Sequence, residues 1–128
     1  MTITPLYAGI LAIFFFALSV RVVALRRGGV SLGDGGNPAM LRRIRGHGNF
    51  AEYVPFILLM MGFLELSHVS PYLLHGLGIV LVVARLLHGY ALSFTQKFFL
   101  GRFLGTVLTF GLLVVCGVLC LCQGLQMA

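Results

Sequence analysis

The stretch Arg45–Phe56, RGHGNFAEYVPF, joins a polar stripe to the start of an apolar run. Arg45, Asn49 and Glu52 are spaced by four and three residues, so on a helix their side chains lie along one face. The uncharged run Val54–Leu64 follows directly. Charged side chains at the mouth of a membrane helix are costly and by default indicate a functional site. The alternative is a solvated helix end with ordinary charges.

The composition around this stretch is too apolar for a soluble domain. Of the 128 residues, 59% are hydrophobic and 9% are charged, whereas soluble domains are usually about half apolar or less. Most charged residues fall within residues 21–52 and 85–102, which leaves four apolar blocks. Three of these blocks approach or exceed the roughly 20 residues that span hydrocarbon. The sequence therefore predicts an all-α integral membrane four-helix bundle, with residues 1–128 forming a single transmembrane domain.

Helix boundaries are indicated by proline and glycine. Asn37-Pro38 and Ser70-Pro71 each combine a capping residue with a first-turn proline, and Gly28-Gly29 supplies a helix stop. Gly101 and Gly105 form a small-xxx-small pair that allows close helix approach. We expect helices over residues 5–27, 38–67, 71–93 and 100–124.

The distribution of basic residues predicts the orientation in the membrane. Lysine and arginine surround the first and third connections and are absent from the second connection and from both termini. The positive-inside rule then places both termini on the non-cytoplasmic side. Residues 1–20 have no basic segment or small-residue cleavage site, so we expect a retained helix instead of a signal peptide. The net charge of +6 is expected to attract membrane lipids, and no nucleic-acid partner is expected.

Several other polar residues are interpreted as structural. His68 and His75 have no second ligand at helical spacing, so no metal site is expected. Glu65 lies on the opposite helix face from Glu52, about 20 Å along the axis, and is expected at the outer interface. The cysteines form no CxxC pair and are interpreted as small packing residues: Cys116, Cys120 and Cys122.

The third expected helix adds a second polar group, because Arg85 and His88 are three residues apart and share a face. For Arg85, an ion pair with Glu52 is the structural alternative to ligand contact. Arginines outnumber carboxylates at this end, which suits a ligand with two or more carboxylates or phosphates. Four such helices do not enclose a polar pocket alone, so the stripe is expected to face a neighbouring subunit. The gathered groups are Arg26, Arg27, Arg42, Arg43, Arg45, Asn49, Glu52, Tyr53, Arg85, His88 and Arg102.

The motif RxxxNxxEYxP over Arg45–Pro55 resembles the second-helix signature of the MAPEG family, the membrane-associated proteins in eicosanoid and glutathione metabolism. Arg26-Arg27 before a loop and the sequence ARLLH at Ala84–His88 are similar to that family at the ends of the first and third helices. The resemblance covers nearly the whole chain and favours bacterial members with a GDGG loop like Gly33–Gly36.

The resemblance implies a homotrimer in the bacterial inner membrane that binds glutathione, as a co-substrate, between subunits near the cytoplasmic face. It implies that Glu52 binds the amino group of glutathione. The peptide would be held by Arg45, Asn49, Glu52 and Tyr53, with further contacts from Arg26 or Arg27, Arg85 and His88.

Arg102 falls where the family's thiol-activating arginine is expected, and we assign it as the catalytic residue. A free thiol titrates near pH 8.5, so a guanidinium beside the sulfur favours the nucleophilic thiolate. The chain has Leu92 and Thr106 where family synthases often have tyrosines, which disfavours prostaglandin and leukotriene synthase activities. We therefore expect a glutathione transferase or peroxidase acting on lipophilic electrophiles.

Two other function classes remain open. One is a catalytically silent membrane subunit that binds glutathione or an anionic lipid. The other is a small exporter of lipophilic cations, which is disfavoured because the first helix has no carboxylate and the surplus of arginine repels cations.

Overall fold

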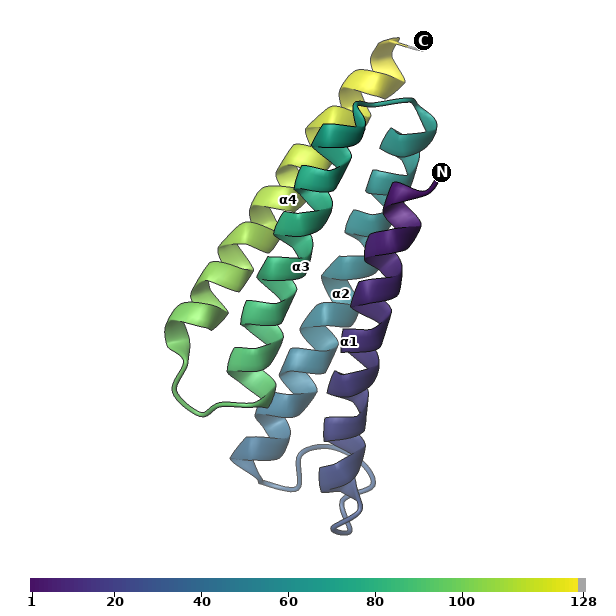
Figure 1. Cartoon of the computed structure of the whole chain (residues 1–128). Helices are drawn as coiled ribbons and strands as arrows, with labels where there is room; N and C mark the ends of the chain where they lie inside the picture. The colour runs from purple at the N-terminus through teal and green to yellow at the C-terminus, as the bar shows by residue number, and fades with distance from the viewer. Residues whose placement is uncertain (127–128) are drawn as a thin grey trace.

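The computed structural model describes residues 1–126, and every regular element in that range is an α-helix (Figure 1). All four helices are long and apolar enough to cross a membrane. The predicted all-α membrane bundle is therefore confirmed. Residues 127–128 of the predicted domain lie outside the described range. The helices are α1 (Ile3–Arg26), α2 (Pro38–Leu66), α3 (Pro71–Ser93) and α4 (Phe99–Gln126).

At most of the helix termini, the observed boundary differs from the expected one by one or two residues. Differences of this size are usual at helix ends. The start of α2 is capped by Asn37, whose Oδ1 accepts hydrogen bonds from the amides of Ala39 at 2.9 Å and Met40 at 3.4 Å. The start of α3 is different. Ser70 precedes Pro71 as expected, but its side chain makes no capping hydrogen bond, so the proline alone marks that terminus.

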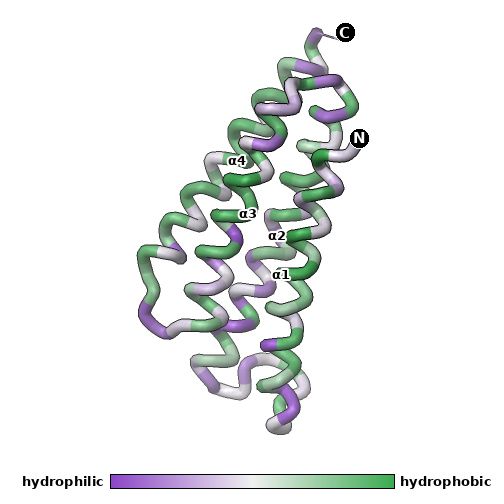
Figure 2. The backbone as a smooth tube through the Cα atoms, in the orientation of Figure 1, coloured by the Kyte–Doolittle hydropathy of each residue, from purple (hydrophilic) through white to green (hydrophobic). Residues whose placement is uncertain are grey.

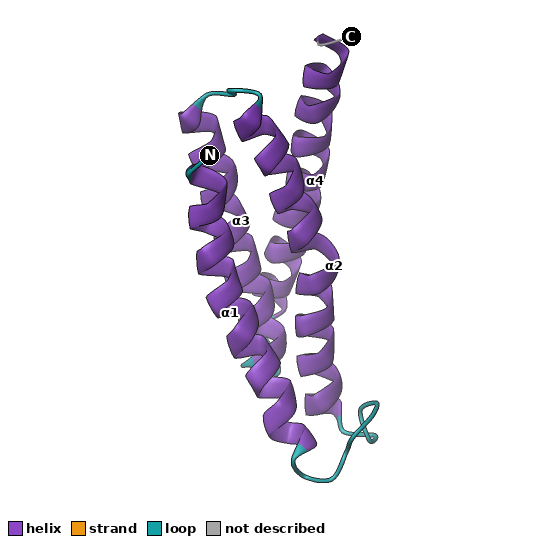
Figure 3. Ribbon diagram, turned by 90° about the vertical axis from the view of Figure 1, so that its right-hand side faces the viewer, coloured by secondary structure: helices purple, strands orange, loops and turns teal. Residues whose placement is uncertain are grey.

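Helices α2 and α3 form the centre of the bundle. Each packs against the other three helices, whereas α1 and α4 make no contact with each other among the described residues. Figure 3 shows the same arrangement from the side, with the C-terminal turns of α4 extending past the other helices. Where α3 lies between its neighbours, the polar side chains of Arg85, His88 and Ser93 are buried.

The core is apolar, and most of the outer surface is apolar as well. Leu18, Ile57, Met61 and Leu81 are fully buried, while large hydrophobic side chains project outward from all four helices. Figure 2 shows hydrophilic residues at the end with the two longer loops, on the nearby parts of α2 and α3, and also around the α2–α3 connection and the C-terminal turns of α4. The lysine and arginine residues lie toward the end with the two longer loops, on an otherwise lipid-compatible bundle.

At the opposite end of the bundle, Glu65 of α2 binds the first turn of α1. Its carboxylate accepts hydrogen bonds from the backbone amides of Thr2 at 2.5 Å, Ile3 at 2.8 Å and Thr4 at 2.7 Å. These amides have no partners within the helix, and the helix dipole favours a negative charge beside them. The sequence suggested an interfacial position for Glu65 but gave no signal of this contact.

Helix α4 closely approaches the backbone of α3 at Gly105. A Cβ atom placed on Gly105 would lie 2.6 Å from both the backbone oxygen of Ala84 and the Cβ of His88. The small-residue pair predicted this approach, and Gly105 is the member that meets the neighbouring helix, since the space at Gly101 is occupied by Phe98 of its own turn.

Gly105→Ala should lower the melting temperature of the detergent-purified protein, because the added methyl group forces α3 and α4 apart. The expected loss is about 1–3 kcal/mol, the usual cost of overpacking. Gly117→Ala is the matched control in the same helix, since nothing lies within 4 Å of its would-be Cβ atom. The control should be neutral or stabilising by up to about 1 kcal/mol through helix propensity. Equal melting temperatures for the two variants would contradict the close approach.

Candidate functional site

The polar stripe of α2 is open on the outer face of the single chain. Arg45 Nη1 lies 3.7 Å from Glu52 Oε1, and the two side chains are 53% and 52% exposed. Asn49 lies between them and is half-buried. An exposed ion pair of this length contributes little to stability, so both groups can exchange partners at small cost.

Arg85 of α3 is buried deep between helices, with 0% exposure. Its guanidinium donates hydrogen bonds to Thr109 Oγ1 at 3.3 Å and to His88 Nδ1 at 3.3 Å, and it lies 5.6 Å from the ring centroid of Phe50. The predicted alternative of an Arg85–Glu52 ion pair is wrong. Arg85 points toward α4, whereas Glu52 stays on the outer face of α2 and pairs with Arg45.

Within residues 1–126, the buried guanidinium of Arg85 has no carboxylate partner. The chain contains three acidic residues, and each of them is engaged elsewhere. Asp34 accepts a hydrogen bond from the loop amide of Gly36, and the glutamates bind Arg45 and the start of α1. The Nε atom of Arg85 also has no hydrogen-bond partner among the residues that the structure describes. Buried charges are normally paired, so this position favours an anionic ligand nearby.

The contacts of α4 bring three helices together around Arg85. The Thr109 hydroxyl donates a hydrogen bond to the Gly105 carbonyl at 2.7 Å while accepting one from Arg85. One turn of helix separates Thr109 from Gly105, which lies against His88. On the α2 side, the half-buried ring of Tyr53 lies 5.5 Å from the ring of Phe110. Tyr53, Arg85 and His88 are thus gathered along the inner face of α4.

Arg102 lies one turn before Gly105 at the arginine-rich end of α4 and is exposed. It lines a small cavity of about 130 Å³ together with Arg42 and Lys97. Three cations around one cavity, with no carboxylate among its lining residues, produce a strongly positive local field. The exposed position leaves the Arg102 guanidinium free to meet a ligand from outside the chain.

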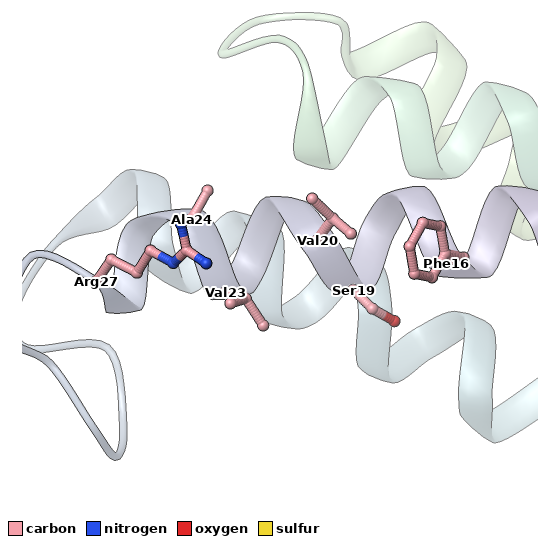
Figure 4. A pocket seen from close by; sticks show the side chains of 6 residues that line it. All are labelled: Phe16, Ser19, Val20, Val23, Ala24 and Arg27. Atoms are coloured by element: carbon pink, nitrogen blue, oxygen red, sulfur yellow. The ribbon is translucent and has the colours of Figure 1, made fainter.

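Arg26 and Arg27 have different environments. Arg26 Nη1 donates hydrogen bonds to the loop carbonyls of Gly33 at 3.0 Å and Val30 at 3.5 Å, so it holds the α1–α2 loop. Arg27 is exposed and lies at the end of an apolar groove of about 330 Å³ on the outer side of α1 (Figure 4). Of the two alternatives predicted for ligand contact, Arg27 is the one with a free guanidinium. The other residues lining the groove are Phe16, Ser19, Val20, Val23 and Ala24.

Within one chain, Arg27 and the α2 stripe are not brought together. Helix α1 meets α2 through His47, whose Nε2 lies 3.0 Å from Ser19 Oγ and whose ring stacks on Phe15 at 4.6 Å. At about 100° per residue, Arg45 and Glu52 lie roughly 160° and 140° around α2 from His47. The stripe and the α1 groove therefore face different neighbours.

Sequence reasoning missed the residues that hold Arg85 in place. Thr109 and Phe50 were not singled out, although a threonine one turn after Gly105 in an otherwise apolar helix is a detectable signal. Phe50 could not be recognised in this way, since an aromatic residue in a membrane helix is usual. The remaining predicted residues are placed as described, and their roles toward a ligand stay predictions.

Comparison with known proteins identifies relatives of the whole bundle. The model of the MAPEG family matches residues 4–122, which include most of all four helices. The chain is also similar to Inner membrane protein YecN of Escherichia coli strain K12 and of Escherichia coli O6:H1. Each is 38% identical over 89 residues, covering 69% of this chain and 68% of the relative. No solved structure matches.

Thr109→Val should destabilise the ligand-free protein by about 1–3 kcal/mol, because it removes a hydrogen-bond acceptor from a buried guanidinium. Arg85→Met should be neutral or stabilising, since it replaces an unpaired buried charge with an apolar side chain of similar length. The double variant should recover the stability lost by Thr109→Val alone. Melting temperatures in one detergent provide the comparison.

The double variant is the control for a loss caused by Thr109 packing alone. If Thr109→Val costs the same in the presence of Arg85 and of Met at position 85, then the hydrogen bond between Arg85 and Thr109 carries no stability and the interpretation of the buried cluster is wrong.

Proposed function

This chain belongs to the MAPEG family, and from that premise we propose that it is a glutathione transferase or peroxidase of the inner membrane that acts on lipophilic electrophiles. The main support for this proposal is the excess of arginine over carboxylate around the α2 stripe. Arg85 is buried there without a carboxylate partner in residues 1–126. The inner-membrane assignment is supported by the name of the YecN relatives.

Glutathione has the complementary chemistry for these groups, because it carries two carboxylates, one amine and one thiol. Guanidinium groups bind carboxylates through paired hydrogen bonds, which suits the exposed Arg45. The buried Arg85 would favour the anionic ligand through its positive charge. Glu52 is the one carboxylate of the stripe and would receive the amine, while Asn49 and Tyr53 would donate and accept neutral hydrogen bonds. Binding would break the weak Arg45–Glu52 pair and give each partner a charged group of the ligand.

A site between subunits of a homotrimer accounts for the position of Arg27. The groove that ends at Arg27 and the α2 stripe lie on different sides of the single chain. One ligand would contact both only if they came from adjacent copies, which is the heterologous contact of a closed ring. The apolar groove of one subunit would then offer the lipophilic substrate a place beside the thiol held by its neighbour.

Arg102 would activate the thiol of bound glutathione. The thiol proton passes to water, and the guanidinium stabilises the resulting thiolate. The thiolate attacks an electrophilic carbon, so a carbon–sulfur bond forms while the leaving group departs with its bonding electrons. With a lipid peroxide, the sulfur attacks oxygen and the O–O bond breaks to give an alcohol and a sulfenic acid. A second glutathione converts the sulfenic acid to the disulfide and water.

The two positions where family synthases often carry tyrosine offer no free phenol here. Leu92 is 5% exposed and packs closely against Gly46 of α2. The Thr106 hydroxyl donates its hydrogen bond to the carbonyl of Arg102, 2.9 Å away. These arrangements favour a general transferase over an eicosanoid synthase.

Arg102→Leu should leave glutathione affinity nearly intact while kcat with a chromogenic electrophile falls by up to about thirtyfold at pH 7. That limit follows because roughly 3% of an unassisted thiol with a pKa of 8.5 is ionised at this pH. The deficit should shrink above pH 8.5, where the thiol ionises without help. Arg102→Lys keeps the positive charge and should retain more activity than Arg102→Leu.

Steady-state rates from pH 6 to 9.5 measure this profile. Equal kcat in wild type and Arg102→Leu, or a deficit that is independent of pH, would refute thiol activation by Arg102. Glutathione binding without any turnover in the wild type would instead favour a catalytically silent subunit.

Mixed trimers test whether the site is shared between subunits. Arg27→Ala and Arg102→Ala subunits, each impaired alone, should regain activity when they are coexpressed. In a random equal mixture, about a quarter of the interfaces would pair an intact Arg102 with an intact Arg27 of the neighbour. Recovery toward about a quarter of the wild-type activity is expected. Activity no higher than the average of the two separate variants would show that Arg27 and Arg102 of adjacent subunits do not complete one site, and it would contradict the shared site.

A further inference from the structure

A second group of arginines lies at the same end of the bundle, where α1 and α2 meet the end of α3. Arg21 donates hydrogen bonds through Nε and Nη2 to the carbonyl of Ser93, at 3.1 and 2.8 Å. Arg42 reaches the carbonyls of Ala91 at 2.8 Å and Thr95 at 3.0 Å. Both arginines thus bind the C-terminal end of α3, where the helix dipole is negative.

These contacts use only part of the available donors. A guanidinium has five N–H groups, and Arg43 spends one nitrogen, Nη1, on the carbonyl of Arg21 at 2.7 Å. No carboxylate lies within ion-pair distance of Arg21, Arg42 or Arg43 in residues 1–126, where the one salt bridge joins Arg45 to Glu52. Three neighbouring cations therefore retain free donors and uncompensated charge.

The three arginines surround a cavity of about 130 Å³, whose lining also includes Ser93 and Phe94. At roughly 30 Å³ per water molecule, this space holds about four waters, or one phosphate group with little room to spare. It is too small for a peptide. The cavity is thus a match for a compact tetrahedral anion at the membrane boundary.

An apolar groove of about 290 Å³ lies next to this cavity, and Phe94 lines both. The Arg21 guanidinium carbon is 3.9 Å from the centroid of the Phe94 ring, and the ring of Tyr90 stacks on Phe94 at 5.6 Å. The groove runs between α1 and α3 and opens to the lipid-facing surface. The remaining residues lining it are Phe14, Leu86, Leu87 and Phe98.

We infer that Arg21, Arg42 and Arg43 bind the phosphate of an anionic phospholipid whose acyl chain occupies the adjoining groove between α1 and α3. The cationic cavity supplies charge complementarity to the headgroup, and the aromatic groove supplies apolar contact in line with it. Basic pockets between membrane helices are a recognised way of holding such headgroups. A soluble phosphate would use the cavity alone and leave the groove without a role.

This lipid site is separate from the proposed glutathione site. None of its three arginines belongs to the α2 stripe, and Arg43 faces α1, where it binds the carbonyl of Arg21. Arg42 and Gln96 line cavities on both sides, since they also border the cavity of Arg102. The lipid inference does not require the protein to be an enzyme.

The test compares the purified protein in nanodiscs of phosphatidylglycerol and of phosphatidylcholine, with native mass spectrometry to count retained lipids. Wild type should keep phosphatidylglycerol in preference to phosphatidylcholine and should melt at a higher temperature in the anionic nanodisc. Arg43→Gln should lose about fivefold of that preference, the factor expected for one arginine beside an anionic headgroup. Lys97→Gln removes one charge at the same end, outside this cavity, and should keep the preference.

Leu86→Trp fills the groove from its exposed side without altering an arginine. It therefore provides an independent test of the site if Arg43→Gln fails to fold. It should also reduce phosphatidylglycerol retention. An equal loss of the preference for phosphatidylglycerol in Lys97→Gln and Arg43→Gln would show a nonspecific effect of surface charge and would overturn the proposed lipid site. Stabilisation of detergent-purified protein by inorganic phosphate equal to that by the lipid, with Leu86→Trp unaffected, would reassign the cavity to a soluble anion and overturn the lipid proposal.

Discussion

The chain has nine basic residues against three acidic ones, and the fold places most of the cations at one end of a membrane bundle. The three carboxylates bind other groups: Asp34 accepts a hydrogen bond within the α1–α2 loop, Glu52 pairs with the exposed Arg45, and Glu65 binds the start of α1 at the far end. Backbone carbonyls and hydroxyl groups take up part of the remaining guanidinium donors. Charge balance at this end must therefore come from molecules outside the chain.

Helix α2 divides that end into two arginine-containing regions of different character. On its outer side, Arg45 and Glu52 are half exposed and weakly paired, which suits a ligand that enters and leaves. On the side toward α1, Arg21 and Arg43 donate hydrogen bonds to backbone carbonyls and are held in position. This arrangement suits a permanently bound ligand. The first region fits a reacting peptide, and the second fits a resident lipid headgroup.

The sequence was sufficient for the architecture because hydrophobic blocks, caps and proline positions are local signals. It also indicated the α2 stripe and the close approach of Gly105, both of which follow from helical spacing. It could not establish the partner of Arg85, because the choice between Glu52 and Thr109 depends on how α3 is rotated between its neighbours. The contact of Glu65 with the first turn of α1 was hidden for the same reason: it joins residues more than sixty positions apart.

Thermal melting of the detergent-purified wild type shows whether the uncompensated arginines bind glutathione. Reduced glutathione should raise the melting temperature in a saturable way, because it binds the folded protein selectively. The diethyl ester of glutathione keeps the thiol and amine but lacks the carboxylate charges, so it should give a much smaller rise. No rise with glutathione, or an equal rise with the ester, would contradict the account.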